Sequence, residues 1–126
     1  LGDAECDEGS IWESVIFASR MSLNNLIGIV DRNRLSVTDV ILENEGSGKL
    51  EDKFRACGWQ CAVIDGHSFE EILAVFEQAN QQKLPLMIIA NTVKGKGVSF
   101  MENGIKWHHS IPSADEIIIA RQELGD

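Results

Sequence analysis

The chain has 126 residues, of which 44% are apolar and 25% charged, as in an ordinary globular domain large enough to bury a core. Its 11 basic and 20 acidic side chains give a net charge of −9, which argues against a nucleic acid or an anionic membrane as partner. The apolar runs are too short to cross a bilayer and no leader opens the chain, so we expect a cytoplasmic location. The 3 cysteines lack the spacing of a zinc site or redox dithiol, which indicates reduced thiols.

Two polar clusters bracket a helix and a strand in the first third of the chain. An acidic loop from Gly2 to Gly9 precedes an apolar helical stretch that we expect to run to about Met21. Ser10 and Glu13 have the spacing of a capping box that would start this helix. The run 26–30 is continuously apolar, which predicts a strand covered on both faces and ended by the second polar cluster.

Residues 33–48 are polar and predict a long connection with little regular structure. A short helix over 49–57 should then end at Gly58, followed by a strand over 60–64. Ser68 and Glu71 repeat the capping-box spacing and open a helix whose buried face should comprise Phe69, Ile72, Leu73, Val75 and Phe76.

Pro85 introduces a strong strand over 86–90, and a loop with Gly95 and Gly97 follows it. Ser113 and Glu116 start a last helix that reaches Leu124. Because strands alternate with helices, we predict an α/β fold with a parallel sheet and helices on both faces.

A loop motif that should follow a strand has only one residue, Leu1, before it. We therefore expect the upstream strands to lie elsewhere, either because the chain has been cut or because another polypeptide supplies them. If a strand ending just before Gly2 pairs with the strand that begins at Leu26, both polar clusters lie at carboxyl ends, where open α/β sheets bind ligands.

Asp3, Asn33 and a nearby backbone carbonyl would form a set of oxygen ligands for a metal ion in this arrangement. One carboxylate and two neutral oxygens suit Mg²⁺ that is already neutralised by a bound diphosphate better than an all-protein calcium cage. The alternative is that Asp3 is a turn or capping residue and that Asn33 is an ordinary residue of a turn after a strand.

The two polar clusters resemble the thiamin diphosphate signature of the transketolase family. That pattern comprises Gly-Asp-Gly-Glu, an acidic Glu-Gly, a Trp-Glu helix start and a strand ending in Asp-x-Asn-x-Leu. A second resemblance, in the same order as in the family, covers residues 92–103 and the pair Trp107 and His108. The first pattern is matched here by Gly2, Asp3, Glu5, Glu8, Gly9, Trp12, Glu13, Asp31, Asn33 and Leu35.

The resemblance implies that the chain is the second half of a diphosphate-binding domain, with thiamin diphosphate and Mg²⁺ as cofactors. It implies that Asp3, Asn33 and the backbone carbonyl of Leu35 are the metal ligands. Glu8 and Glu13 are similar to acids between the two active sites of a family dimer, although Glu13 also has a capping explanation. His108 resembles a residue near the reacting carbon, and the adjacent His109 leaves that assignment open. The implied cofactor-binding residues are Gly2, Asp3, Ala4, Glu5, Asn33, Leu35 and Lys94.

The sequence departs from the family at two positions, and several basic residues have no settled role. Ala4 stands where the family has Gly, so we expect cofactor binding to survive with reduced affinity. Ser110 stands two residues after His108, where the family often has a Lys, and this puts the usual substrate handling in doubt. Lys94 is either a cofactor contact or a solvated charge, and Arg34, Lys96 and His67 are as readily surface residues as phosphate contacts.

By this resemblance we expect a transferase that passes a two-carbon ketol unit between sugar phosphates. It would act only with partner polypeptides that supply the upstream strands and the pyrimidine-side domain, in a dimer of such assemblies. Three alternatives stay open: a relative such as the deoxyxylulose phosphate synthases, a non-catalytic assembly or regulatory subunit with the same fold, and a plain α/β nucleotide-phosphate module.

Overall fold

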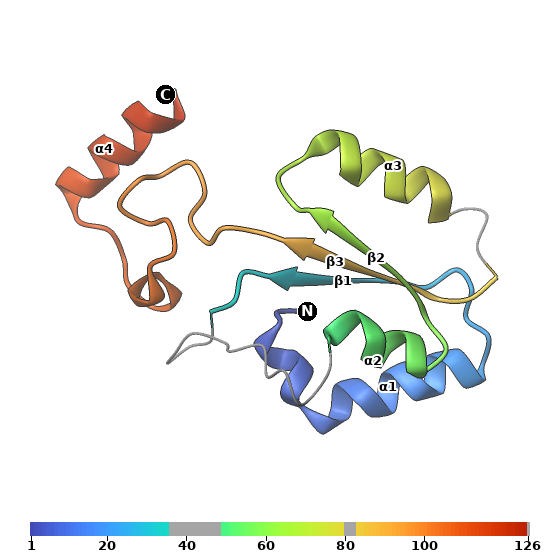
Figure 1. Cartoon of the computed structure of the whole chain (residues 1–126). Coiled ribbons are helices and arrows are strands. Elements are labelled where there is room, and N and C mark those ends of the chain that lie inside the picture. The colour runs from blue at the N-terminus through green and yellow to red at the C-terminus, as the bar shows by residue number, and fades with distance from the viewer. Residues whose placement is uncertain (36–48, 80–82, 126) are drawn as a thin grey trace.

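A parallel sheet of three strands forms the centre of the fold in a computed structural model that describes residues 1–35, 49–79 and 83–125. The strands β1 (Ile27–Arg32), β2 (Gln60–Asp65) and β3 (Leu86–Asn91) have the order β1-β3-β2 (Figure 1). All five core positions of β3 from residue 86 to 90 are buried, as expected for a strand with a neighbour on each side. The predicted parallel α/β sheet is confirmed.

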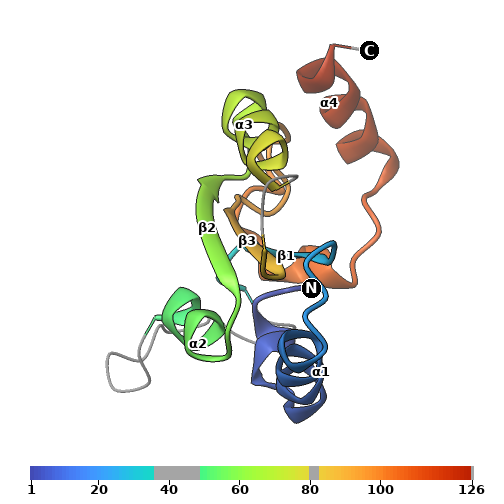
Figure 2. The ribbon, with the colours of Figure 1, turned by 90° about the vertical axis from the view of Figure 1, so that its right-hand side faces the viewer.

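Helices lie on both faces of this sheet. The helices α1 (Gly9–Arg20) and α2 (Leu50–Ala56) cover one face, and α3 (Phe69–Ala79) covers the other (Figure 2). The short 3-10 helix η1 (Ala4–Asp7) leads into α1, while η3 (Ile105–His108) and α4 (Ala114–Leu124) lie beyond the carboxyl ends of the strands (Figure 1). Within the described ranges no helix is long and apolar enough to cross a membrane.

The face under α1 and α2, here named the tryptophan face, carries the larger core. Phe54 and Val30 are fully buried there, and the Phe54 ring lies 5.1 Å from that of Trp12, centroid to centroid. The indole N–H of Trp59 donates to the carbonyl of Val15 at 2.8 Å, so its one polar atom is satisfied inside the core. These contacts join α1 and α2 to the sheet.

The opposite side, here named the α3 face, is less covered than the sequence predicted. Among the described residues, its buried cluster consists of Val75, Leu86 and Ile88. Phe69 is 82% exposed, and Ile29 on the edge strand β1 is 45% exposed. Two predictions are therefore wrong for this chain. The strand at 26–30 is not covered on both faces, and α3 does not bury the five predicted side chains. The physical reason is that α3 packs on β2 and leaves β1 uncovered on that side.

The predicted helix caps have mixed outcomes. The box of Ser113 and Glu116 at the start of α4 is complete, and Gly58 follows α2 with a left-handed φ of +85°. At α3 the Ser68 hydroxyl accepts from the Glu71 N–H, but the Glu71 carboxylate accepts from the N–H of Asp65 instead of Ser68.

The predicted capping box of Ser10 and Glu13 is wrong. η1 runs almost directly into α1, so the helix begins at Gly9 and Glu8 occupies the cap position. Ser10 is already helical, and its carbonyl accepts from the Ser14 hydroxyl at 2.9 Å. Most of the predicted 33–48 connection, and residues 80–82 after α3, lie outside the described residues.

Candidate functional site

The first residues of the chain lie parallel to β1 at its free edge. The N–H of Asp31 donates to the carbonyl of Leu1 at 2.8 Å, and the N–H of Asp3 donates to the carbonyl of Asp31 at 3.2 Å. Gly2 and Asp31 form a parallel bridge between the two segments. The expected pairing beside β1 is thus present, and it places Asp3 next to the carboxyl end of that strand.

Asp3 is a buried carboxylate, only 9% exposed. Its Oδ1 accepts from the N–H of Ala4 at 3.0 Å, and its Oδ2 accepts from the N–H of Arg34 at 2.6 Å. Burial raises the pKa of this carboxyl group and the negative charge of Asp31 raises it further, while the backbone hydrogen bonds oppose both. No cationic side chain forms an ion pair with Asp3 in the part of the chain that the structure describes. The site therefore holds a negative charge that a metal ion could neutralise.

Asn33 lies in a tight turn directly after β1. Arg34 has a φ of +61°, an uncommon conformation for a residue other than glycine, and strained backbone of this kind clusters at functional sites. The Asn33 Oδ1 accepts from the N–H of Leu35 at 3.0 Å, and its Nδ2 faces Asp31 Oδ2 at 3.4 Å. Leu35 is buried and anchors the far side of the turn. Within the described part of the chain no second donor bonds to the Asn33 amide oxygen, which leaves one acceptor position for a cation.

The donor set fits Mg²⁺ only in company with another anionic ligand. Across the described ranges no three His, Cys, Asp or Glu side chains come close enough to hold a metal ion by themselves. Asp3, Asn33 and the Leu35 carbonyl offer three oxygen donors, whereas Mg²⁺ takes six and is commonly held by one or two carboxylates plus substrate phosphates. This chemistry agrees with the predicted ion bound to a diphosphate.

A cavity of about 490 Å³ opens beside this turn. Asn33 and Lys94, both predicted cofactor contacts, line it together with Asp31, His67 and Thr92. The N–H of Val93 donates to His67 Nε2 at 2.8 Å, so the imidazole holds the loop that carries Lys94. Thr92 begins the second block of the family resemblance but was not predicted as a site residue, because the sequence does not show which side chains it meets.

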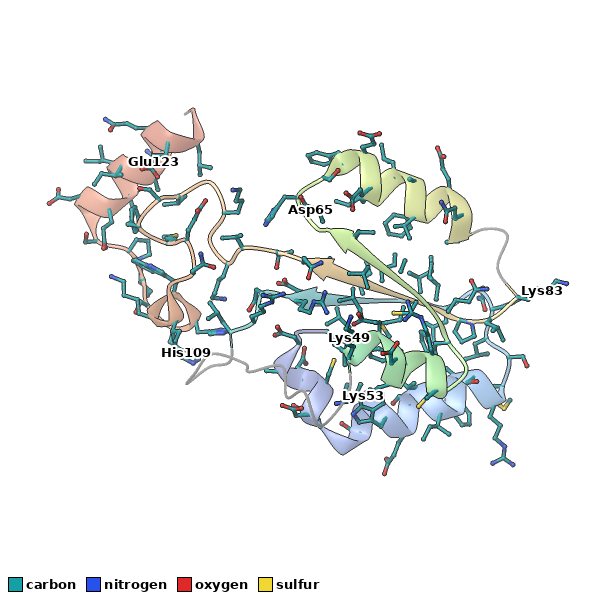
Figure 3. The ribbon with its side chains drawn as sticks, viewed as in Figure 1. Lys49, Lys53, Asp65, Lys83, His109 and Glu123 are labelled. Atoms are coloured by element: carbon teal, nitrogen blue, oxygen red, sulfur yellow. The ribbon has the colours of Figure 1, made fainter. Side chains whose placement is uncertain are left out.

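His108 lies in η3 and is not among the residues that line this cavity. Its Nε2 is buried and has no hydrogen-bond partner among the residues that the structure describes, an arrangement that costs about 1–3 kcal/mol unless another group satisfies it. The adjacent His109 is exposed (Figure 3), and the two ring centroids are 6.0 Å apart. The Trp107 indole N–H donates to the carbonyl of Phe100 at 2.9 Å and anchors the segment. The geometry thus favours His108 over His109 as the functional histidine.

The remaining predicted residues lie on the α1 side of the sheet edge. Glu5 accepts from the N–H of Gly2 and so closes the loop around Asp3. Ala4 begins η1 and is not among the described residues with positive φ, so its methyl group causes no backbone strain. Glu8 and Glu13 are both exposed, and Glu13 lines a separate cavity with the apolar side chains of α1 and the turn after it. Because Ser10 and Glu13 form no capping box, helix capping does not explain the presence of Glu13 at this position.

Comparisons with known proteins agree with this geometry. The family model of the transketolase thiamine diphosphate binding domain matches residues 1–126. The chain is 36% identical over 127 residues to an apulose-4-phosphate transketolase subunit of Phocaeicola vulgatus, covering 100% of this chain and 45% of the relative. It is 44% identical over 110 residues to the 6-deoxy-6-sulfo-D-fructose transketolase subunit SqwG of Clostridium sp. (strain MSTE9), covering 86% of this chain and 40% of the relative.

A solved structure agrees as well. The crystal structure of transketolase from Campylobacter jejuni matches with a TM-score of 0.89 at 31% identity, covering 99% of this chain and 20% of that one. The chain thus spans less than half the length of the relatives that it matches.

Proposed function

Because this chain belongs to the transketolase thiamine diphosphate-binding domain family, we propose that it binds Mg²⁺ together with the diphosphate of thiamin diphosphate. We further propose that it is part of an enzyme that transfers a two-carbon ketol unit between sugar phosphates. Asp3 carries this proposal, since it is a buried carboxylate without a cationic partner among the described residues, hydrogen-bonded to the turn that presents Asn33. A buried charge of this kind needs a counterion, and a divalent ion would supply it.

Each proposed residue has one task at this site. Asp3, Asn33 and the Leu35 carbonyl hold the metal ion, while the backbone from Gly2 to Glu5 borders the diphosphate. Lys94 brings a positive charge to the cavity next to Asn33. When bound, thiamin diphosphate supplies the nucleophilic carbon for breaking and forming the carbon–carbon bond, and the protein provides position and electrostatics.

His108 and the two exposed glutamates are proposed to act away from the metal. The His108 Nε2, buried and without a hydrogen-bond partner among the described residues, would orient a sugar hydroxyl and hold or release its proton. Glu8 and Glu13 would face the second active site across a dimer interface. Their exposure in this chain leaves them accessible to such a partner.

We propose that the upstream strands and the pyrimidine-side domain come from outside these 126 residues, in part from another polypeptide. The relatives from Phocaeicola vulgatus and Clostridium sp. are both named as transketolase subunits, which supports a multi-chain enzyme. All three cysteines are free thiols, which supports the proposed cytoplasmic location.

The proposal is tested by titrating the assembled protein with thiamin diphosphate at increasing Mg²⁺ concentrations in a calorimeter. We expect Mg²⁺-dependent binding and a loss of about 100-fold or more in Asp3→Asn, because removing a ligand should exceed the effect of removing its supporting residues. An equal preference for ADP would instead favour a plain nucleotide-phosphate module. Product formation from pyruvate but not from a ketose donor would favour a deoxyxylulose phosphate synthase, and ketol transfer by this chain alone would contradict the partner requirement.

Ala4 gives a second test of the same site. Since its φ is not positive, replacement by Gly relieves no backbone strain and would act only through the space that the methyl group takes from the proposed diphosphate. We expect Ala4→Gly to tighten binding of the cofactor in the same calorimetric titration. Unchanged affinity would show that the methyl group does not narrow the site.

A further inference from the structure

We propose that Asp31 and Thr92 are positioning residues that fix the side-chain amide of Asn33 so that its oxygen, and not its nitrogen, faces the metal ion. This inference rests on the proposed function, because it assumes that Asn33 is a ligand. Neither Asp31 nor Thr92 is proposed to touch the metal. Their task is to select one of the two orientations of an amide group that has nearly the same shape in both.

Asn33 needs such selection because only its oxygen can coordinate a cation. A rotation of the amide by half a turn would present the NH₂ group to the ion, which is repulsive. In the structure the N–H of Leu35 donates to Oδ1 at 3.0 Å, and Asp31 Oδ2 faces Nδ2 at 3.4 Å. Both contacts favour the same orientation, and the carboxylate would repel the amide oxygen in the reversed one.

Asp31 is well placed to couple the two metal-ligand segments. Its backbone pairs with Leu1 and Asp3 on one side, and its side chain reaches Asn33, two residues later in the chain. However, Asp31 is an exposed side chain, and by itself it could adopt other rotamers. A second contact is needed if it is to hold the amide.

Thr92 provides that second contact from the neighbouring strand. It follows β3 directly, and its hydroxyl donates to Asp31 Oδ1, which leaves Oδ2 for Asn33. The methyl group of Thr92 lies over Gly66, where an added Cβ would come within 2.5 Å of the Thr92 Cγ2. Because the methyl group fits into the space that this glycine leaves, the hydroxyl is turned toward Asp31. Supporting contacts of this kind orient metal ligands in many sites.

The test compares Asp31→Asn, Thr92→Val and Thr92→Ser in the assembled protein, with thiamin diphosphate and Mg²⁺ as probes. Asp31→Asn offers Asn33 either an oxygen or an NH₂ group, so the selection is lost, and we expect the apparent affinity for Mg²⁺ to fall about 10-fold. Thr92→Val keeps the shape but removes the hydroxyl, and we expect a loss of about threefold, as for one net hydrogen bond. Thr92→Ser keeps the hydroxyl, so its apparent affinity for Mg²⁺ should be close to that of the unmodified protein.

The dependence on metal concentration separates positioning from general damage. If the variants only weaken the metal ligand, saturating Mg²⁺ should restore the affinity for thiamin diphosphate, and the melting temperature without cofactor should stay unchanged. A loss that saturating Mg²⁺ does not restore would overturn the inference. Wild-type Mg²⁺ dependence in both Asp31→Asn and Thr92→Val would also overturn it, while the proposed function would stand.

Two further outcomes complete the test. If Asp31→Asn does not fold, the pair Thr92→Val and Thr92→Ser decides alone, and equal losses in both would overturn the role of the hydroxyl. If the unmodified protein shows no Mg²⁺-dependent binding of thiamin diphosphate, the proposed function itself fails. That result is distinguishable from a failure confined to the variants.

Discussion

The two faces of the sheet are built from the same strands but are covered very differently. On the tryptophan face, Val30 and Phe54 are fully buried among aromatic rings from two helices. On the α3 face, Ile29 is 45% exposed although it is the residue just before Val30 in the same strand. An apolar side chain in a strand is therefore buried only where another element packs over it, which the run 26–30 alone does not reveal.

The difference between the faces bears on the site at the carboxyl edge. The Trp12 indole N–H donates to the carbonyl of Cys6 at 2.8 Å, so the tryptophan face holds the 3-10 helix that begins directly after Asp3. Along β1 the side chain of Asp31 points to the face opposite that of Val30, the same face as Ile29. The cavity lined by Asp31 and Lys94 opens there. The densely packed face thus anchors the loop that carries Asp3, and the cavity lined by Lys94 opens on the other face.

The largest expected effect comes from a matched pair of phenylalanines. Phe54→Ala leaves a cavity between Trp12 and Trp59 and should lower the free energy of unfolding by about 3–5 kcal/mol. Phe69→Ala, on the α3 face at 82% exposure, should change it by less than about 0.5 kcal/mol. Urea titrations followed by tryptophan fluorescence and circular dichroism measure both values. Similar losses in the two variants would show that the faces are equally covered.

The next effect concerns the thiols on the tryptophan face. Burial raises the pKa of Cys6 and of Cys61 from 9.0 to about 11, so at pH 8 each carries about 100-fold less thiolate than an ordinary cysteine. We expect iodoacetamide to alkylate both about 100-fold more slowly in the folded chain than in urea, and the rate to rise with pH up to about 11. Peptide mapping by mass spectrometry follows each site. Equal rates in the folded and unfolded chain would contradict tight packing here.

The smallest effect compares two consecutive residues of β1. Val30→Thr places a hydroxyl group in the core and should cost about 1–3 kcal/mol of unfolding free energy. Ile29→Thr places it on the exposed side and should cost less than about 0.5 kcal/mol in this chain. Repeating the pair in the assembled protein sharpens the comparison. There, a rise in the cost of Ile29→Thr would show that a partner covers the α3 face.

The sequence predicted the elements well where the signal was local. The strand over 86–90, the helix after Ser113 and the left-handed Gly58 were all confirmed, because apolar runs, caps and turn residues act within a few positions. The predicted capping box of Ser10 and Glu13 was wrong because it, too, was inferred from nearby residues alone. Its spacing was right, but η1 begins the helical conformation earlier than any signal near Ser10 indicates.

The candidate site was predictable in part. Asp3, Asn33 and Lys94 follow from polar residues at strand ends and from the family resemblance, and the structure brings Asp3 to the Asn33 turn and Lys94 to the cavity beside it. The contact between Asp31 and Thr92 joins residues 61 positions apart, and no pattern near either of them indicates it. The left-handed φ of Arg34 could not be predicted from the sequence either, because arginine has no preference for that conformation.

The order of strands and helices, the parallel pairing and the polar strand ends were determined by the sequence itself, since each depends on the periodicity and caps of a short segment. Only the tertiary structure decided which face of each strand is buried, which oxygens of Asp3 and Asn33 are already hydrogen-bonded, and which residues support them. Those features depend on the register between strands that are distant in the chain. A shift of one residue would turn Val30 outward and Asp31 inward without changing the sequence.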